Sequence, residues 1–158
     1  AVVSVKSSIS AKSMPETRSI KGACHCGNIR FLLRWPGSKT EIPVRRCGCT
    51  FCQNHGAAWT SERNSSLSIE IGDESLVSRY RFGTETADFF VCSVCGVVPV
   101  ALSEIDNERF AVVNVNTFEE TSGLAFSSTA TNFDGEEIGD RLERRKRNWI
   151  TGVSLSHS

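Results

Sequence analysis

Three short stretches, CHCG at residues 24–27, CGCTFC at residues 47–52 and CSVCG at residues 92–96, contain all seven cysteines of this 158-residue chain. An odd number of cysteines cannot form a complete set of disulfides, and cysteines this close in sequence seldom have the Cα separation of an unstrained disulfide. Short spacings of this kind are typical of tetrahedral metal sites. The pattern therefore favours zinc over a disulfide framework, which is the alternative, and it predicts a cytoplasmic location where thiols stay reduced.

The first and third stretches each contain a pair of cysteines followed at once by a glycine, which lets the chain reverse without a Cβ clash. One pair supplies half of a structural tetrahedron. The simplest division joins the two pairs, because pairing the middle stretch with either one would leave the other pair without partners. We therefore predict a closed structural zinc site formed by Cys24, Cys26, Cys92 and Cys95.

The middle stretch offers three thiolates, from Cys47, Cys49 and Cys52, and three protein ligands leave one tetrahedral position open. We predict that this trio binds a catalytic zinc ion, so that the chain holds two. Three thiolates on a dication leave a net charge near −1, which makes a weak Lewis acid but a good holder of a substrate thiol. Two alternatives stay open: His55 closes the site as a fourth ligand, or it acts beside the metal as a proton-handling group, as Glu62 also can.

The rest of the chain predicts a mostly β fold made of small antiparallel sheets. Alternating or β-branched runs predict strands at residues 67–71, 76–82, 97–102 and 110–115. Residues 123–131 predict a loop or an irregular edge, and residues 139–150 predict a short C-terminal helix with Asp140 near its start. We predict one domain over residues 19–150, flanked by tails at residues 1–18 and 151–158.

Composition narrows the function classes. Eighteen basic residues balance eighteen acidic ones, so no net charge draws the chain to nucleic acid or to a membrane, and neither is expected as a partner. No run reaches the length of a membrane span, and no apolar segment predicts a secretory signal. The basic run RLERRKR at residues 141–147 is interpreted as a solvated helix face, and the three tryptophans as packing residues.

The motifs GACHCGNIRF (22–31), RRCGCTFCQNHGAAW (45–59), FFVCSVCGVVPV (89–100) and AVVNVNTF (111–118) resemble the glutathione-dependent formaldehyde-activating enzyme family, which includes the centromere protein V domain. The resemblance extends over residues 21–149. It implies a zinc-bound β-tent fold. It also implies a structural zinc on Cys24, Cys26, Cys92 and Cys95 and a catalytic zinc on Cys47, Cys49 and Cys52.

The activity that the resemblance implies is that of a carbon–sulfur lyase, the reversible addition of the glutathione thiol to formaldehyde, which gives S-(hydroxymethyl)glutathione. We therefore predict a zinc-dependent enzyme that adds or removes a glutathione-like thiol at a small aldehyde. The alternative is a zinc-stabilised module that binds protein or nucleic acid without catalysis.

Overall fold

The computed structural model describes residues 17–157, which form two β-sheets, two α-helices and two 3₁₀ turns. Most of the predicted N-terminal tail, residues 1–16, lies outside the described residues. The smaller sheet contains, in spatial order, β1 (Arg18–Ala23), β2 (Ile29–Trp35), β5 (Ser66–Ile71) and β11 (Gly152–His157). The larger sheet contains, in spatial order, β10 (Ala125–Thr131), β3 (Glu41–Cys47), β4 (Trp59–Thr60), β9 (Glu108–Asn114), β8 (Val100–Ile105), β7 (Asp88–Cys92) and β6 (Val77–Tyr80).

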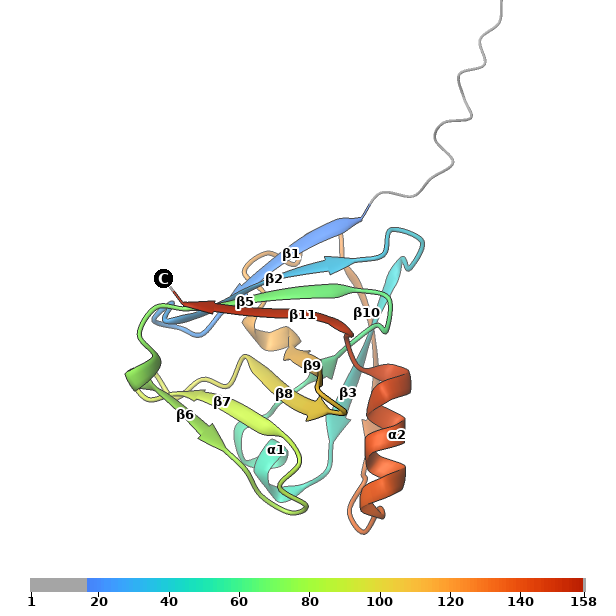
Figure 1. The fold of residues 1–158 in the computed structure, drawn as a ribbon. Helices are drawn as coiled ribbons and strands as arrows, with labels where there is room; N and C mark the ends of the chain where they lie inside the picture. Colours follow the sequence, from blue (N-terminus) through green and yellow to red (C-terminus); the bar gives the residue numbers. More distant parts are fainter. Residues whose placement is uncertain (1–16, 158) are drawn as a thin grey trace, which may run out of the picture.

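The helices occupy the side of the larger sheet that faces away from the smaller one. Helix α1 (Thr50–His55) follows β3, and α2 (Ile138–Asn148) connects β10 to β11; the 3₁₀ turns are η2 (Glu74–Leu76) and η3 (Val115–Thr117). In Figure 1 the smaller sheet lies across the top of the molecule, the larger sheet lies below it, and α2 runs down one side. The prediction of a mostly β fold with a short C-terminal helix is confirmed.

Two edge strands differ from the sequence analysis. Residues 151–158 are not a tail, because Gly152–His157 forms β11, which pairs in parallel with β5. Of the two alternatives for residues 123–131, the loop is wrong and the edge is closer, because Ala125–Thr131 forms β10, a regular edge strand parallel to β3. All other strand pairs are antiparallel, as predicted. Strand β10 is rich in serine, threonine and alanine, and β11 contains two serines and a glycine, so pairing with a partner strand orders segments that their own side chains do not mark as strands.

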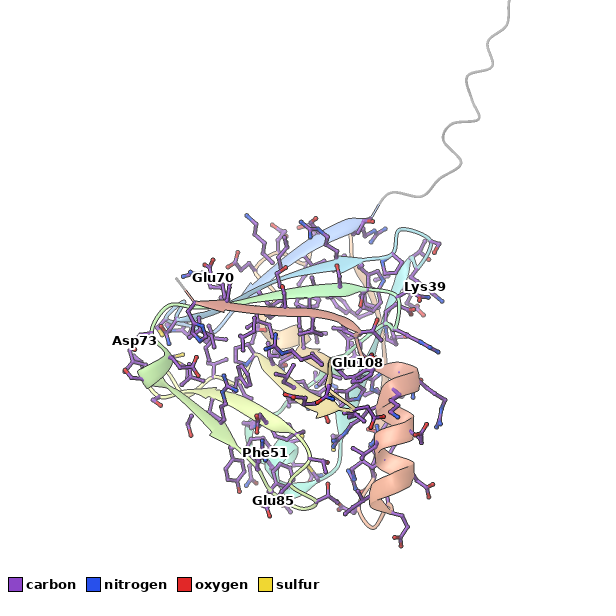
Figure 2. The ribbon with its side chains drawn as sticks, viewed as in Figure 1. Lys39, Phe51, Glu70, Asp73, Glu85 and Glu108 are labelled. Atoms are coloured by element: carbon purple, nitrogen blue, oxygen red, sulfur yellow. The ribbon has the colours of Figure 1, made fainter. Side chains whose placement is uncertain are left out.

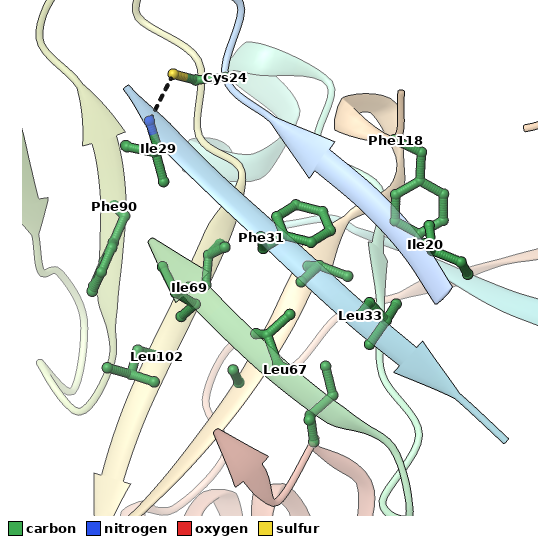
Figure 3. Packing of buried hydrophobic residues seen from close by; sticks show 14 of the residues in the cluster. Ile20, Cys24, Ile29, Phe31, Leu33, Leu67, Ile69, Phe90, Leu102 and Phe118 are labelled. Atoms are coloured by element: carbon green, nitrogen blue, oxygen red, sulfur yellow. Dashed lines mark hydrogen bonds between the residues drawn. The ribbon is translucent and has the colours of Figure 1, made fainter. Parts of the chain in front are cut away.

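The main core fills the space between the two sheets (Figure 3). Strand β2 buries every second residue, which fixes its register against its neighbours. Its inward side chains meet Phe90 and Leu102 of the larger sheet. The inward residues of β2 and β5 are Ile29, Phe31, Leu33, Trp35, Leu67, Ile69 and Ile71.

Strands β8 and β9 are buried on both faces, because one face meets the main core and the other a second apolar cluster. Val100 and Val113 point into the main core, whereas Ala101 and Val112 belong to the second cluster. Trp59 and Trp149 lie in that cluster and Trp35 in the first, in agreement with their interpretation as packing residues. The central strands β8 and β9 therefore separate the main core on one face from the second apolar cluster on the other.

Helix α2 is fixed at its end by a bridge to the larger sheet. Ile150 and Ala111 exchange two backbone hydrogen bonds, of 2.9 and 3.1 Å. Asp140 in its first turn and three basic residues in its last turn suit the helix dipole. Within residues 17–157, no helix has the length and apolar character needed to cross a membrane.

Candidate metal centres

The two cysteine pairs predicted to share a metal meet between the sheets. Cys24 and Cys26 lie in the turn from β1 to β2, and Cys92 and Cys95 lie at the end of β7 and in the turn that follows. The four Sγ atoms all lie within 4.8 Å of one another. Cys26 Sγ is 3.8 Å from Cys24 Sγ and 3.4 Å from Cys92 Sγ, and a tetrahedral zinc with Zn–S bonds of about 2.3 Å holds its sulfurs about 3.8 Å apart. The donor set and its spacing fit zinc.

The two turns that carry these cysteines are built alike. Gly27 and Gly96, each directly after the second cysteine, have φ values of 86° and 80°, a region that disfavours residues with a Cβ. Gly27 N donates to Cys24 O at 3.0 Å, and Gly96 N donates to Cys92 O at 2.8 Å. Ile29 N also donates to Cys24 Sγ at 3.3 Å (Figure 3). The glycine after each pair therefore has the role that the sequence predicts for it.

The third group gathers at the junction of β3 and α1. The Sγ atoms of Cys47, Cys49 and Cys52 lie within 4.8 Å of one another. Cys49 is the N-cap of α1, and its Sγ accepts a hydrogen bond from Cys52 N at 3.4 Å. Cys47 Sγ accepts one from Cys49 N at 3.5 Å. Backbone N–H groups thus hold two of the three sulfurs. Three cysteine sulfurs are a suitable ligand set for zinc, and their spacing fits that ion as the first group does.

The trio has an indole donor that the spacing of its cysteines does not predict. Trp59 Nε1 donates to Cys52 Sγ at 3.3 Å, and both side chains are buried. Without a metal, the hydrogen bond with the Cys52 thiol lowers the pKa of Cys47 to about 5, and the same contact raises the pKa of Cys52. The trio thus already holds one thiolate at neutral pH, and binding of a cation would displace the remaining protons.

The three sulfurs open into a pocket of about 470 Å³ between the larger sheet and α2. This volume lies within the range of about 300–1,000 Å³ found for small-molecule sites. One wall is apolar and belongs to the second apolar cluster. Its lining side chains are Trp59, Ala87, Phe89, Ala101, Val112 and Trp149.

The opposite wall is basic and comes from β3 and α2. Arg45, Arg141, Arg144 and Arg145 all line the pocket, and Arg145 is only 6% exposed. The interpretation of residues 141–147 as a solvated helix face is therefore wrong for three of the five basic residues in that run. The sequence shows the basic run, but it does not show that α2 turns these arginines toward the sheet.

The other predicted site residues lie elsewhere. His55 ends α1 with an exposed side chain, and its ring packs edge-on against Phe51, with ring centroids 4.5 Å apart. The structure does not bring it into the group of ligand atoms that contains the trio. Glu62 lies outside the pocket wall, where Oε1 accepts from Asn64 N at 3.3 Å.

A cluster of aromatic side chains lies beside the trio, around Phe51 of α1. Phe51 packs against Tyr80, Phe82 and Phe89 with centroid distances of 5.1, 5.1 and 4.9 Å. Figure 2 shows Phe51 between α1 and β6. Phe82 and Phe89 continue into the pocket wall, so this group joins α1, and hence the trio, to the rim of the pocket.

Comparison with known proteins identifies a family and a solved structure to which this chain is similar. The sequence pattern of the family described as glutathione-dependent formaldehyde-activating enzyme matches residues 19–133, a range that includes all seven cysteines and Arg45 but not α2. A Rhodobacter sphaeroides protein, solved by crystallography as a structural genomics target, is 28% identical; the similarity covers 68% of this chain and 99% of that one, with a TM-score of 0.48.

Proposed function

Because this chain belongs to the glutathione-dependent formaldehyde-activating enzyme family, we propose that it is a zinc-dependent carbon–sulfur lyase. The reaction joins a thiol to a small aldehyde and runs in both directions. In the forward direction the sulfur forms a bond to the carbonyl carbon, the C=O π bond becomes a hydroxyl, and the thiol proton ends on that oxygen. No oxidant or reductant is needed.

The observation that carries this proposal is the position of the trio. Its sulfurs line a pocket of about 470 Å³, and no fourth side-chain ligand joins them within the described residues. A zinc ion bound there supplies a coordination position that holds a substrate sulfur as a thiolate. The four-sulfur group, in contrast, has a complete set of ligands.

The residues around the trio support the same chemistry. Trp59 fixes the Cys52 sulfur, and its N–H withdraws charge from that thiolate. The apolar wall of Phe89, Ala101 and Val112 excludes water, which otherwise competes with the thiol for the aldehyde. Addition of a thiol to an aldehyde is intrinsically easy, so holding the two reactants together supplies most of the acceleration.

We propose glutathione and formaldehyde as the first pair to test, since the family's description names both. We also propose a reducing, cytoplasmic location. All seven cysteines are free thiols in the structure, and both metal groups need them reduced.

The test replaces zinc by cobalt and follows the visible spectrum of the trio. Millimolar glutathione is expected to change the spectrum of the wild-type protein and to leave that of Cys49→Ser unchanged. Cys49 is the variant of choice because it is only half-buried and the indole N–H of Trp59 donates to Cys52 instead. Turnover of thiol and aldehyde pairs is measured in parallel, with Cys49→Ser as the blank.

The alternative, a binding module with two structural metals, gives different results. It requires a protein ligand in the fourth position of the trio, and His55 was the candidate for it. If His55→Ala abolishes metal binding by the trio and no thiol changes the cobalt spectrum, the lyase proposal is wrong.

A further inference from the structure

Arg145 is a buried cation without an anionic partner among residues 17–157. Its Nη1 donates to Thr86 Oγ1 at 2.7 Å, to Ser103 Oγ at 3.1 Å and to Thr86 O at 3.2 Å, all neutral acceptors. Its Nε is buried and has no hydrogen-bond partner among residues 17–157. Within the same residues, no carboxylate oxygen lies within 4.0 Å of the guanidinium. A buried charge in this state is unfavourable unless a ligand neutralises it.

Arg45 of β3 is half-buried and lines the same pocket. Its Nη2 donates to Ser61 Oγ at 2.6 Å, and that hydroxyl donates to Asn148 O at 2.7 Å. It too has no carboxylate within 4.0 Å in the described part of the chain. Because Arg45 and Cys47 are two residues apart on β3, their side chains leave the strand on the same face. The arginine therefore lies beside the trio and not behind it.

The acidic residues of the pocket do not neutralise these two arginines. Glu136 is engaged by Arg144, with contacts of 3.0 to 3.2 Å, and lies 3.8 Å from Arg141 Nε. Asp134 and Glu137 also line the pocket, but both are exposed to solvent.

The other arginines of α2 add to the uncompensated positive charge around Arg145. Burial, followed by the charges of Arg141 and Arg144, lowers the pKa of Arg145 to about 10. The guanidinium groups of Arg45 and Arg145 remain charged at neutral pH. The pocket thus has a sulfur-rich end and a cationic wall in which, among the described residues, Arg45 and Arg145 have no carboxylate within 4.0 Å.

We propose that Arg45 and Arg145 bind a carboxylate of the thiol substrate, so that the pocket selects thiols that carry a carboxylate over neutral or cationic thiols. This inference rests on the proposed function for the sulfur end of the substrate. Planar guanidinium groups match a carboxylate in charge and geometry. Arg145 comes from α2, beyond the residues 19–133 that match the family pattern, so this half of the subsite is inferred from the structure of this chain.

The first test measures binding without turnover. S-methylglutathione keeps both carboxylates of glutathione but has no free thiol. Its diethyl ester also lacks a free thiol, and both of its carboxylates are esterified and uncharged. Calorimetry with the zinc-loaded wild-type protein is expected to show tighter binding of the free acid than of the diester. Arg145→Met and Arg45→Met are each expected to weaken binding of the free acid about 10- to 100-fold, the value of charge-assisted hydrogen bonds, and to remove the preference over the diester.

The controls separate charge from fold. Arg147→Met changes an exposed arginine on the same helix and should leave binding of S-methylglutathione unchanged. Arg145→Lys keeps the positive charge but loses the paired N–H donors of the planar guanidinium. Its affinity for S-methylglutathione should lie between those of wild type and Arg145→Met. Thermal melts accompany every variant, and if Arg145→Met does not fold, Arg45→Met carries the test. Equal binding of acid and diester by the wild type would overturn the proposal, as would equal losses in Arg145→Met and Arg147→Met.

A kinetic arm distinguishes this inference from the proposed function. With formaldehyde as acceptor, the KM for 3-mercaptopropionate should rise at least tenfold in Arg145→Met, while the KM for 2-mercaptoethanol stays constant. Glyoxylate as acceptor with 2-mercaptoethanol tests whether the carboxylate belongs to the aldehyde instead, and an effect of Arg145→Met confined to that pair would overturn the proposal. If no pair is turned over but binding still depends on the carboxylate, the lyase proposal is wrong, whereas the proposal that Arg45 and Arg145 bind a carboxylate stands.

Discussion

The two cysteine groups use the same ligand atom for different purposes. The four-sulfur group joins parts of the chain that are far apart: Cys26 and Cys92 are separated by 66 positions, and they come from different sheets. The three-sulfur group spans residues 47–52 at one strand–helix junction and faces a pocket. The separation of the ligands along the chain, which is large in one group and small in the other, is the basis on which we propose a structural metal for the first and a reactive metal for the second.

The largest effect that this comparison predicts is on folding. Cys92→Ser and Cys52→Ser both change a buried cysteine, 1% and 3% exposed. Structural zinc contributes about 10 kcal/mol or more of apparent binding free energy, which approaches or exceeds the total stability of about 5–15 kcal/mol of a typical domain. We expect Cys92→Ser to lose its cooperative unfolding transition in thermal and urea melts.

Cys52→Ser is expected to keep that transition, because its metal closes only a short loop. A loss of stability of about 1–3 kcal/mol is expected from the broken contacts of Cys52. Equal destabilisation of the two variants would abolish the distinction between the groups.

The second effect is on metal content and turnover. Cys49→Ser removes one ligand from the trio and leaves the four-sulfur group complete. Elemental analysis is expected to show a fall from two zinc ions per chain toward one, with turnover lost and the melting temperature nearly unchanged. Cys95→Ser, also half-buried, is the matched change in the other group, and it should lower the melting temperature far more.

The third effect concerns the turns that carry the ligands. Gly96 has a positive φ of 80°, so Gly96→Ala should cost about 1–2 kcal/mol of unfolding free energy. Gly48, between two cysteines of the trio, has no positive φ, and a Cβ there would meet Thr131 O at an ordinary 3.4 Å. Urea titration of Gly48→Ala should show a change below about 0.5 kcal/mol. A larger loss in Gly48→Ala than in Gly96→Ala would contradict this account of the two turns.

The smallest effect tests the indole. Trp59→Phe removes the N–H donor to Cys52 Sγ but keeps an aromatic ring in the wall. One neutral donor is worth about 0.5–1.5 kcal/mol, so the zinc affinity of the trio should fall about two- to tenfold in competition with a chelator. The zinc of the four-sulfur group should be unaffected, and a change there would show that the two groups are coupled.

The sequence predicts the ligand groups well because ligand spacing is local. The pairs at 24–26 and 92–95 and the glycines after them determine turns that form within a few residues. The predicted strands at 67–71 and 110–115 also agree with the structure, because alternation or a β-branched run is visible within each segment.

Features that depend on tertiary packing were missed. In β11, Val153 and Leu155 alternate with polar residues, a signal hidden in a serine-rich segment. The burial of Arg145 has no local signal, because helix propensity is the same whether an arginine faces solvent or a pocket. The bridge of Ile150 to Ala111, the packing of Trp149 and the hydrogen bonds of Arg145 fix which way α2 faces.

The order of the pocket's parts along the chain has a consequence for biosynthesis. The last cysteine is Cys95, and the apolar wall is complete at Val112 except for Trp149, whereas α2 begins only at Ile138. Chains emerge from the ribosome at about 5–20 residues per second, so both sulfur groups become available seconds before the helix that covers the trio. A metal ion delivered to the nascent chain therefore meets a trio that α2 does not yet cover, whereas in the finished protein the arginines of α2 line the same pocket.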